Sequence, residues 1–400
     1  MASRLRNPDP TPPSARTSLF SQASSADTPP PPFYNTTFSA HRVSPLHVGR
    51  SPLDAQRLQA LAQRLRDTLV GDVVRGVEVG LDGEDHVMGR AGALEAVQVR
   101  WVNVRDVLEV GAGRGLSVEV RYEAAVCTAL LLPGGEAEAE EGFLELPLLL
   151  MRMPASLKVV IADFLAAAFD CRVSALRLGT RSMVRAWEAW IRAAGLPTRG
   201  PLAKDLVLSL GFYAPPVEKG AADEEGGDAE RGTDQPLGLK SIEVFIPAAE
   251  LRKFVDVGSS DSIRQSRDNK TEGNRGWEDD LKKRRKLAGR LREEGWEWRT
   301  STNTEADGEE SNVLGEQPFT EALGRYLDQH LGLNLFHPGV RIIKIACGGF
   351  VMSESRMKVF APADLGEAAE GDNSASGQRG AVWELVEDLV DKARARDGNR

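Results

Sequence analysis

The sequence predicts an α+β protein with mostly antiparallel twisted sheets, packed helices, a disordered N-terminal tail and acidic loop insertions. Several segments alternate apolar and polar residues with a period of two, which is typical of antiparallel strands with one face in water. Other segments repeat apolar residues at helical spacing. Because strands and helices come in mixed runs rather than in strict alternation, the pattern favours α+β over a parallel α/β sheet.

The predicted tail is residues 1–32. It is rich in Pro, Ser and Thr and ends in four consecutive prolines. Such a segment buries too little apolar surface to offset the entropy cost of ordering it, so we expect disorder. It has no apolar signal core, so secretion is not expected, and no apolar run in the sequence is long enough to predict a membrane span.

An N-terminal α+β domain is expected over residues 33–215. We expect Ser51 to cap its first helix, with Pro52 in the first helical position and Asp54 closing a capping box. The strands predicted in this domain cover residues 73–81, 97–101, 116–122 and 206–212. The most apolar stretch, 143–150, leads into a helix, and the helices have apolar faces within residues 58–69, 157–168 and 183–194.

A Gly- and acid-rich segment at 216–238 predicts a linker or surface loop. Residues 239–400 then form the expected C-terminal α+β half, interrupted by polar gaps at 258–276 and 300–317. Its predicted elements are a strand at 242–246, a helix at 319–331, strands at 340–352 and 356–360, and a terminal helix over 382–390.

Catalytic and metal-binding patterns are not found in the sequence. The glycines at 111, 113 and 115 lead into an alternating strand rather than a helix, which favours a hairpin turn over a phosphate loop. Cys127, Cys171 and Cys347 are widely spaced in apolar surroundings, so we expect buried thiols in a reducing compartment. The five histidines lack zinc spacing. We therefore expect no enzyme, cofactor, metal or small-molecule substrate.

A basic segment at 277–299 rises above the background of a chain whose formal net charge is -9. Five consecutive cations repel one another and must be solvated or neutralised. Three interpretations stay open: a nuclear-import signal, a DNA-contacting patch, or an exposed helix face balanced by nearby acids. The candidate residues are Lys282, Lys283, Arg284, Arg285, Lys286, Arg290 and Arg292, with Arg299, Trp296 and Trp298 close behind.

A weaker basic cluster lies between residues 172 and 199, and part of it falls on the polar side of a predicted helix. A solvated helix face is the expected explanation. Its members are Arg172, Arg177, Arg181, Arg185, Arg192 and Arg199.

Three stretches together resemble the fungal centromere protein L family of the inner kinetochore. The first is Phe33-Tyr34-Asn35-Thr36-Thr37-Phe38, followed by His41-Arg42-Val43-Ser44-Pro45-Leu46. The second is Leu148-Leu149-Leu150-Met151-Arg152-Met153-Pro154 with Phe169-Asp170-Cys171-Arg172-Val173-Ser174-Ala175-Leu176. The third is Asn334-Leu335-Phe336-His337-Pro338-Gly339-Val340 with Ile345-Ala346-Cys347-Gly348-Gly349-Phe350.

The resemblance implies a nuclear subunit of the centromere and kinetochore that serves chromosome segregation. It implies pairing with a centromere protein N-like subunit through a sheet edge of the C-terminal half, contacts with other inner-kinetochore subunits, and a position against centromeric DNA. The alternative is an autonomous nuclear nucleic-acid-binding protein acting through residues 277–299. Carried onto this sequence, the pairing interface is expected at Ile342, Ile343, Ile345, Phe350 and Val351, on a strand that could end at an edge open to another chain. The alternative is that these apolar residues are simply part of the core.

Overall fold

The computed structural model describes residues 29–74, 92–134, 141–197, 203–213, 239–265, 294–299, 317–362 and 372–395. The chain divides into two compact units, Met1–Pro30 and Pro31–Arg400, and every element below belongs to the second. The predicted tail up to residue 28, the acidic segment at 216–238 and the basic segment up to residue 293 lie outside the described residues.

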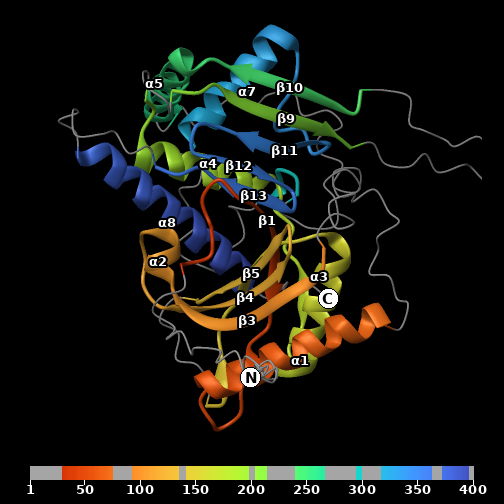
Figure 1. Ribbon diagram of the computed structural model, residues 1–400. Coiled ribbons are helices and arrows are strands. Elements are labelled where there is room, and N and C mark those ends of the chain that lie inside the picture. Colours follow the sequence, from red (N-terminus) through yellow and green to blue (C-terminus); the bar gives the residue numbers. More distant parts are fainter. Residues whose placement is uncertain are drawn as a thin grey trace, which may run out of the picture. The chain divides into compact units, whose positions relative to one another are not determined.

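One antiparallel sheet of eleven strands dominates the described residues (Figure 1). Its order is β10 (Ser241–Ile246), β9 (Leu206–Phe212), β11 (Val340–Ala346), β12 (Phe350–Ser353), β13 (Arg356–Val359), β1 (Thr37–Val43), β7 (Leu148–Arg152), β5 (Val126–Leu132), β4 (Arg114–Tyr122) and β3 (Leu94–Asn103), with β8 (Val173–Ala175) also paired to β1. A small second sheet pairs β2 (Leu46–His47) with β6 (Phe143–Leu144). The mostly antiparallel sheet expected from the sequence is confirmed.

The helices pack against this sheet. They are α1 (Ala55–Val74), α2 (Val104–Leu108), α3 (Ala155–Phe169), α4 (Thr180–Ala194), α5 (Ala248–Gln265), α7 (Pro318–Leu331) and α8 (Asp372–Arg394), with a 3₁₀ turn η2 (Glu297–Arg299). The two sequence halves share the sheet, because Thr37 in β1 pairs with Lys358 in β13. The terminal helix α8 packs on α4, β1 and β7 of the first half.

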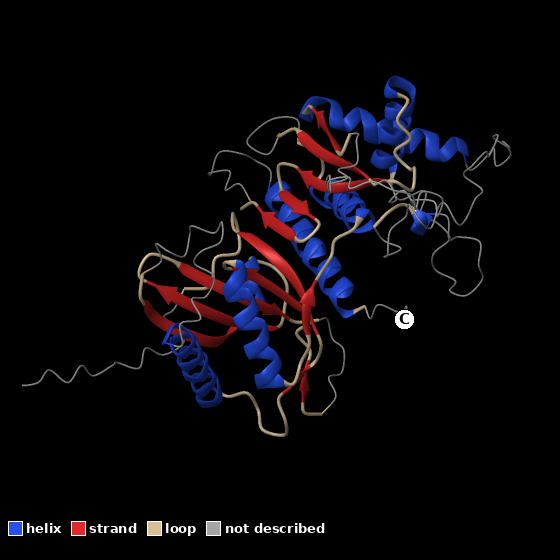
Figure 2. Ribbon diagram, turned by 90° about the vertical axis from the view of Figure 1, so that its right-hand side faces the viewer, coloured by secondary structure: helices blue, strands red, loops and turns tan. Residues whose placement is uncertain are grey.

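Both faces of the central strands are covered, so the prediction of a sheet with one wet face is wrong here. Neighbouring residues of β5 alternate between two cores: Leu131 faces the core under α1 and α3, and Leu130 faces the core with α8. Figure 2 shows helices on both sides of the strands. Local alternation could not reveal this covering because α8 comes more than 200 residues later in the sequence.

Two predicted boundaries are corrected. Asp54, rather than Ser51, caps α1: its Oδ1 accepts the backbone N–H of Arg57 at 2.8 Å, and the helix begins at Ala55. The strand expected at 73–81 begins as helix, since α1 continues to Val74, and residues 75–81 lie outside the described part of the chain.

Helix α5 was not predicted, because the polar residues from 258 onward suggested a gap. Leu251, Phe254 and Val255 do carry the three- and four-residue spacing of a helix face. The predicted strand at 340–352 is a hairpin of β11 and β12 instead. Gly349 lies in its turn, where an added Cβ would overlap the indole of Trp190 in α4.

Candidate protein-interaction surface

The expected interface strand is not an edge. Strand β11 is paired with β9 on one side and β12 on the other, so its main chain is not open to another molecule and that part of the expectation is wrong. Ile342, Ile345 and Phe350 are at most 4% exposed and belong to the chain's own core. The sequence did not reveal this, because β9 lies more than 120 residues before β11.

The other two expected interface residues point away from that core. The β9–β11 register shifts between Ile342 and Lys344, which places Ile343 in an irregular step where it is 39% exposed. The N–H of Ile342 donates to the hydroxyl of Thr180 in α4 at 3.1 Å. Val351 in β12 is partly buried.

The free edge of the sheet in this half is β10. In the described residues β10 pairs only with β9. The N–H of Phe212 donates to the carbonyl of Lys240, which makes this a hydrogen-bonded pair of the β9–β10 ladder. Because such pairs alternate along an antiparallel ladder, Ser241, Glu243 and Phe245 direct their backbone N–H and C=O groups away from β9.

An apolar row crosses the outer face of the strands next to this edge. The register places Phe245 of β10 opposite Val207 of β9, Val207 opposite Ala346 of β11, and Ala346 opposite Val351 of β12. Phe245 is 64% exposed and the other three side chains are partly buried. We call these four residues the outer-face row.

A groove adjoins the same edge, bounded by β10, α5 and α7. It encloses about 490 Å³. Its apolar wall includes Val257, which is 53% exposed, and Tyr326, which is 47% exposed. Apolar side chains of this size are costly to leave in water together, so their clustering at a sheet edge is typical of an interaction surface. The lining is Val244, Phe245, Ile246, Pro247, Glu250, Lys253, Phe254, Val257, Ala322, Leu323, Arg325, Tyr326 and Gln329.

Helix α7 is held in place by a buried carboxylate of α4. Glu188 Oε1 accepts the backbone N–H of Thr320 at 2.8 Å and its hydroxyl at 2.7 Å, and thereby caps the start of α7. Glu188 is 4% exposed, and burial raises its pKa from the ordinary 4.5 to about 7 despite these hydrogen bonds. The close packing of α5 on α7 also depends on Gly258, where a Cβ would overlap the carbonyl of Pro318.

The described end of the basic segment is structural. Trp296 and Trp298 are 2% and 6% exposed, so they are core residues rather than aromatic partners of a surface patch. Arg299 pairs with Glu321, and its guanidinium lies 3.8 Å from the ring centre of Phe336. The residues from Lys282 to Arg292 lie outside the described part of the chain.

Three exposed side chains of this surface, Phe245, Val257 and Tyr326, were not predicted from the sequence. Phe245 breaks the polar/apolar alternation of its strand, since Val244, Phe245 and Ile246 are three adjacent apolar residues. Three adjacent apolar residues in a strand are a sign that both of its faces carry apolar side chains. Val257 belongs to a helix that was not predicted, so nothing pointed to it.

Groups suited to chemistry are not gathered in the described residues. No group of three or more His, Cys, Asp or Glu side chains in that part of the chain is arranged to hold a metal ion. All three cysteines are buried, as expected, and burial raises the pKa of Cys171 and of Cys347 to about 11. Among the helices described, none combines the length and apolar character of a membrane span.

A protein-family model, Centromere protein L, matches the chain over residues 32–394. The chain belongs to the centromere protein L family. The matched range includes every strand and helix described above, from β1 to the last residue of α8. The centromere protein L family is a structural family of the inner kinetochore, located in the nucleus at the centromere, where it serves chromosome segregation. Comparison with curated proteins gives no match.

Proposed function

We propose that this centromere protein L family member is a non-enzymatic scaffold that pairs with a centromere protein N-like subunit through the β10 edge. The partner adds a strand to β10, and its side chains cover the outer-face row and fill the groove beside α5 and α7. The pair then holds other inner-kinetochore subunits against centromeric chromatin. The observation that carries the proposal is a sheet edge with no further strand beside it among the described residues, flanked on both sides by exposed apolar residues.

Two of the interface residues expected from the sequence keep a role in this proposal. Val351 ends the outer-face row, and Ile343 lies on the same outer face, beside Gly211 of β9. Their exposure allows contact with a partner without opening the core. Ile342, Ile345 and Phe350 contribute only indirectly, since they are core residues of β11 and β12, which pack against α4.

The edge is tested by a proline substitution. Glu243→Pro removes an N–H that points away from β9, so the β9–β10 ladder is kept while the hydrogen bonds to an added strand are lost. Val244→Pro is the matched contrast, because it removes an N–H that faces β9. We expect Glu243→Pro to keep the wild-type melting temperature and to lose co-purification with the centromere protein N-like subunit, and Val244→Pro to be destabilised.

The groove is tested by two valines on helices with similar exposure. Val257→Asp places a charge on the groove wall, whereas Val159→Asp places one on α3, where Val159 is 60% exposed. We expect the first change alone to weaken pairing, by more than tenfold in affinity. Equal pairing by both variants, with both folded, would remove the groove from the interface.

The contact with chromatin is assigned to the basic residues 282–286. Cations in such a run neutralise DNA phosphates and release counterions, which makes binding salt-dependent. This role is separable from pairing, because the segment lies about 40 residues from β10 in the sequence.

A further inference from the structure

Three cations lie on the same side of the sheet as the outer-face row. They are Lys344 of β11 and Arg356 and Lys358 of β13. The register places Lys344 opposite Ser353 of β12, and Lys358 opposite Val351, the last residue of the outer-face row. Because residues two apart in a strand share a face, Arg356 lies on the same side as Lys358. We call these three residues the outer-face cations.

The strands next to the outer-face cations place no acid against them. Opposite charges across neighbouring strands stabilise a sheet, and this face lacks such pairs at all three positions. No ion pair links any of the three cations to another residue in the described part of the chain. The residues opposite them in the register are all neutral: Ser209 and Ser353 for Lys344, Val351 and Thr37 for Lys358, and Ser39 for Arg356.

Two acidic residues lie near this face without neutralising it. Glu243 of β10 is two strands from Lys344, and its Oε1 accepts the hydroxyl of Ser209 at 3.4 Å. Two strand spacings are about 10 Å, a distance at which salt screens exposed charges. Glu354 lies in the turn between β12 and β13 and forms no ion pair with Arg356. The outer-face cations are therefore open to a ligand from outside.

An aromatic ring fixes the position of one of these cations. Phe360 continues the β12–β13 pairing by one step, since its N–H donates to the carbonyl of Gly349 at 2.9 Å. The Nζ of Lys358 lies 5.2 Å from the centre of the Phe360 ring. Such a contact attracts the ammonium group to the ring and limits its freedom. Lys358 is thus held beside Val351, at the end of the outer-face row.

A partner that covers this face must remove water from cationic and apolar side chains together. Burying a cation is costly unless a counter-charge is placed against it, and a carboxylate supplies both the charge and hydrogen-bond acceptors. Arg356 and Lys358 are two residues apart, about 6.7 Å, which is also the spacing of side chains on one face of an extended segment. An extended acidic segment therefore matches the cations in charge and in spacing.

We propose that the segment of the pairing subunit that covers the outer-face row is acidic. Its carboxylates face Lys344, Arg356 and Lys358, and its apolar side chains cover Ala346 and Val351 between them. This inference rests on the proposed function, because it names the chemistry of the partner surface at the same site. It goes beyond strand addition at β10, since it assigns a second contact that depends on side chains instead of main-chain hydrogen bonds.

Duplex DNA fits this face less well than an acidic protein segment. A duplex binds cations through its phosphates, and its interfaces with proteins are polar and wet. Its backbone has no apolar group to cover Val207, Ala346 and Val351, which are partly buried on this face. A protein segment with alternating acidic and apolar residues satisfies both kinds of side chain.

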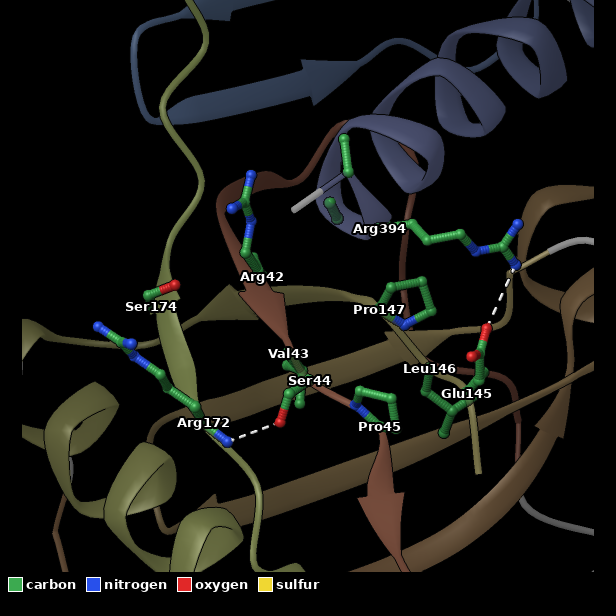
Figure 3. A pocket seen from close by; sticks show the side chains of 12 residues that line it. Arg42, Val43, Ser44, Pro45, Glu145, Leu146, Pro147, Arg172, Ser174 and Arg394 are labelled. Carbon is green, nitrogen blue, oxygen red and sulfur yellow. Dashed lines mark hydrogen bonds and ion pairs between the residues drawn. The ribbon is translucent and has the colours of Figure 1, made fainter. Parts of the chain in front are cut away.

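Cations where β1 meets β8 lack this arrangement. Two Arg-Val-Ser tripeptides, 42–44 and 172–174, pair antiparallel there, and their residues line a cavity of about 420 Å³ together with Arg394 of α8. The side chains of Arg42, Arg172 and Arg394 point in different directions (Figure 3). Arg394 also contacts Glu145 at 3.6 Å. These arginines do not offer one ligand a shared set of cations.

The test measures the affinity of the full-length chain for the centromere protein N-like subunit in nuclease-treated samples, at about 0.1 and 0.5 M salt. Arg356→Glu is the main variant, because Arg356 is exposed and its replacement should leave the melting temperature unchanged. Arg64→Glu is the matched control, since it reverses one exposed arginine of α1. We expect Arg356→Glu to weaken pairing about tenfold at the lower salt and less at the higher, and Arg64→Glu to have no effect.

Zero-length carbodiimide cross-linking tests the acidic contact directly. The reagent joins a lysine amine to a carboxylate in contact with it, so Lys344 and Lys358 should be linked to Asp or Glu of the partner. The inference is overturned if Arg356→Glu pairs as tightly as Arg64→Glu while Glu243→Pro loses pairing, a result that leaves the proposed edge intact. It is also overturned if Arg356→Glu pairs normally and weakens only the binding of a DNA duplex.

One further outcome separates this inference from the proposed edge. Loss of pairing in Arg356→Glu but not in Glu243→Pro would support the acidic contact and overturn strand addition at β10. Absence of pairing by the wild-type chain would overturn both.

Discussion

Replacing Glu188 by glutamine should make the protein more stable at alkaline pH and leave it unchanged at acidic pH. The carboxyl is 4% exposed, and its pKa is raised to about 7 by burial. A folded-state pKa above the unfolded value means that the native state binds the extra proton between pH 4.5 and 7. The associated stability is therefore fully present below pH 4.5 and is lost as the pH rises through 7.

The magnitude follows from the size of the shift. Raising the pKa from 4.5 to about 7 corresponds to about 3 kcal/mol between the two ends of this window. Glutamine is neutral throughout, and its carbonyl oxygen can accept the N–H and the hydroxyl of Thr320 as the carboxylate does. The free energy of unfolding of Glu188→Gln should thus exceed that of the wild type by up to about 3 kcal/mol at pH 8, with little difference at pH 4.5.

Chemical denaturation at both pH values measures the effect, and only the difference between variant and wild type is informative. Burial lowers the pKa of His41 to about 4, so that residue contributes stability above pH 6.5 that is lost as the pH falls, which opposes the trend from Glu188. Glu188→Ala is the control: it leaves the N–H of Thr320 without its acceptor and should be about 1–3 kcal/mol less stable than Glu188→Gln at both pH values, since neither variant titrates at this position. A glutamine variant less stable than wild type at pH 8 would refute the reasoning.

Three further predictions concern binding and packing. Changing the basic residues 282–286 to glutamine should weaken DNA binding by the purified complex. A salt titration should show the slope of log affinity against log salt reduced by about 0.9 for each phosphate that is no longer neutralised. An unchanged slope would leave only the import or solvated-face interpretations. Gly258→Ala should lower the free energy of unfolding by about 2 kcal/mol or more through overlap with Pro318, and a wild-type melting curve would contradict this. Ile343→Asp should stay folded and pair weakly, whereas Ile342→Asp should unfold, because it buries an unpaired carboxylate. Circular dichroism measures the folding of each variant, and identical behaviour of the two would argue against the assignment of their faces.

The class of fold and most of its elements could be predicted from local patterns in the sequence. Period-two alternation in residues 116–122 and helical spacing in residues 319–331 each predicted an element that is present. Those signals are local, since alternation and spacing report which side chains share a face. The absence of catalytic motifs and the family resemblance were also readable without coordinates, and the family membership is confirmed.

The positions of the surfaces, by contrast, depend on the folded arrangement of the whole chain. Alternation does not say which strand pairs with which, so the sequence predicted an edge at β11, whereas β9, more than 120 residues earlier, lies beside it. Among the described strands, the free edge in this half of the sheet is β10, and the outer-face row consists of residues on four strands. The two Arg-Val-Ser tripeptides lie 130 residues apart in the sequence and share one cavity because β1 and β8 pair. Pairing between distant segments is a property of the whole chain, because each strand pairs where its buried face meets a common core.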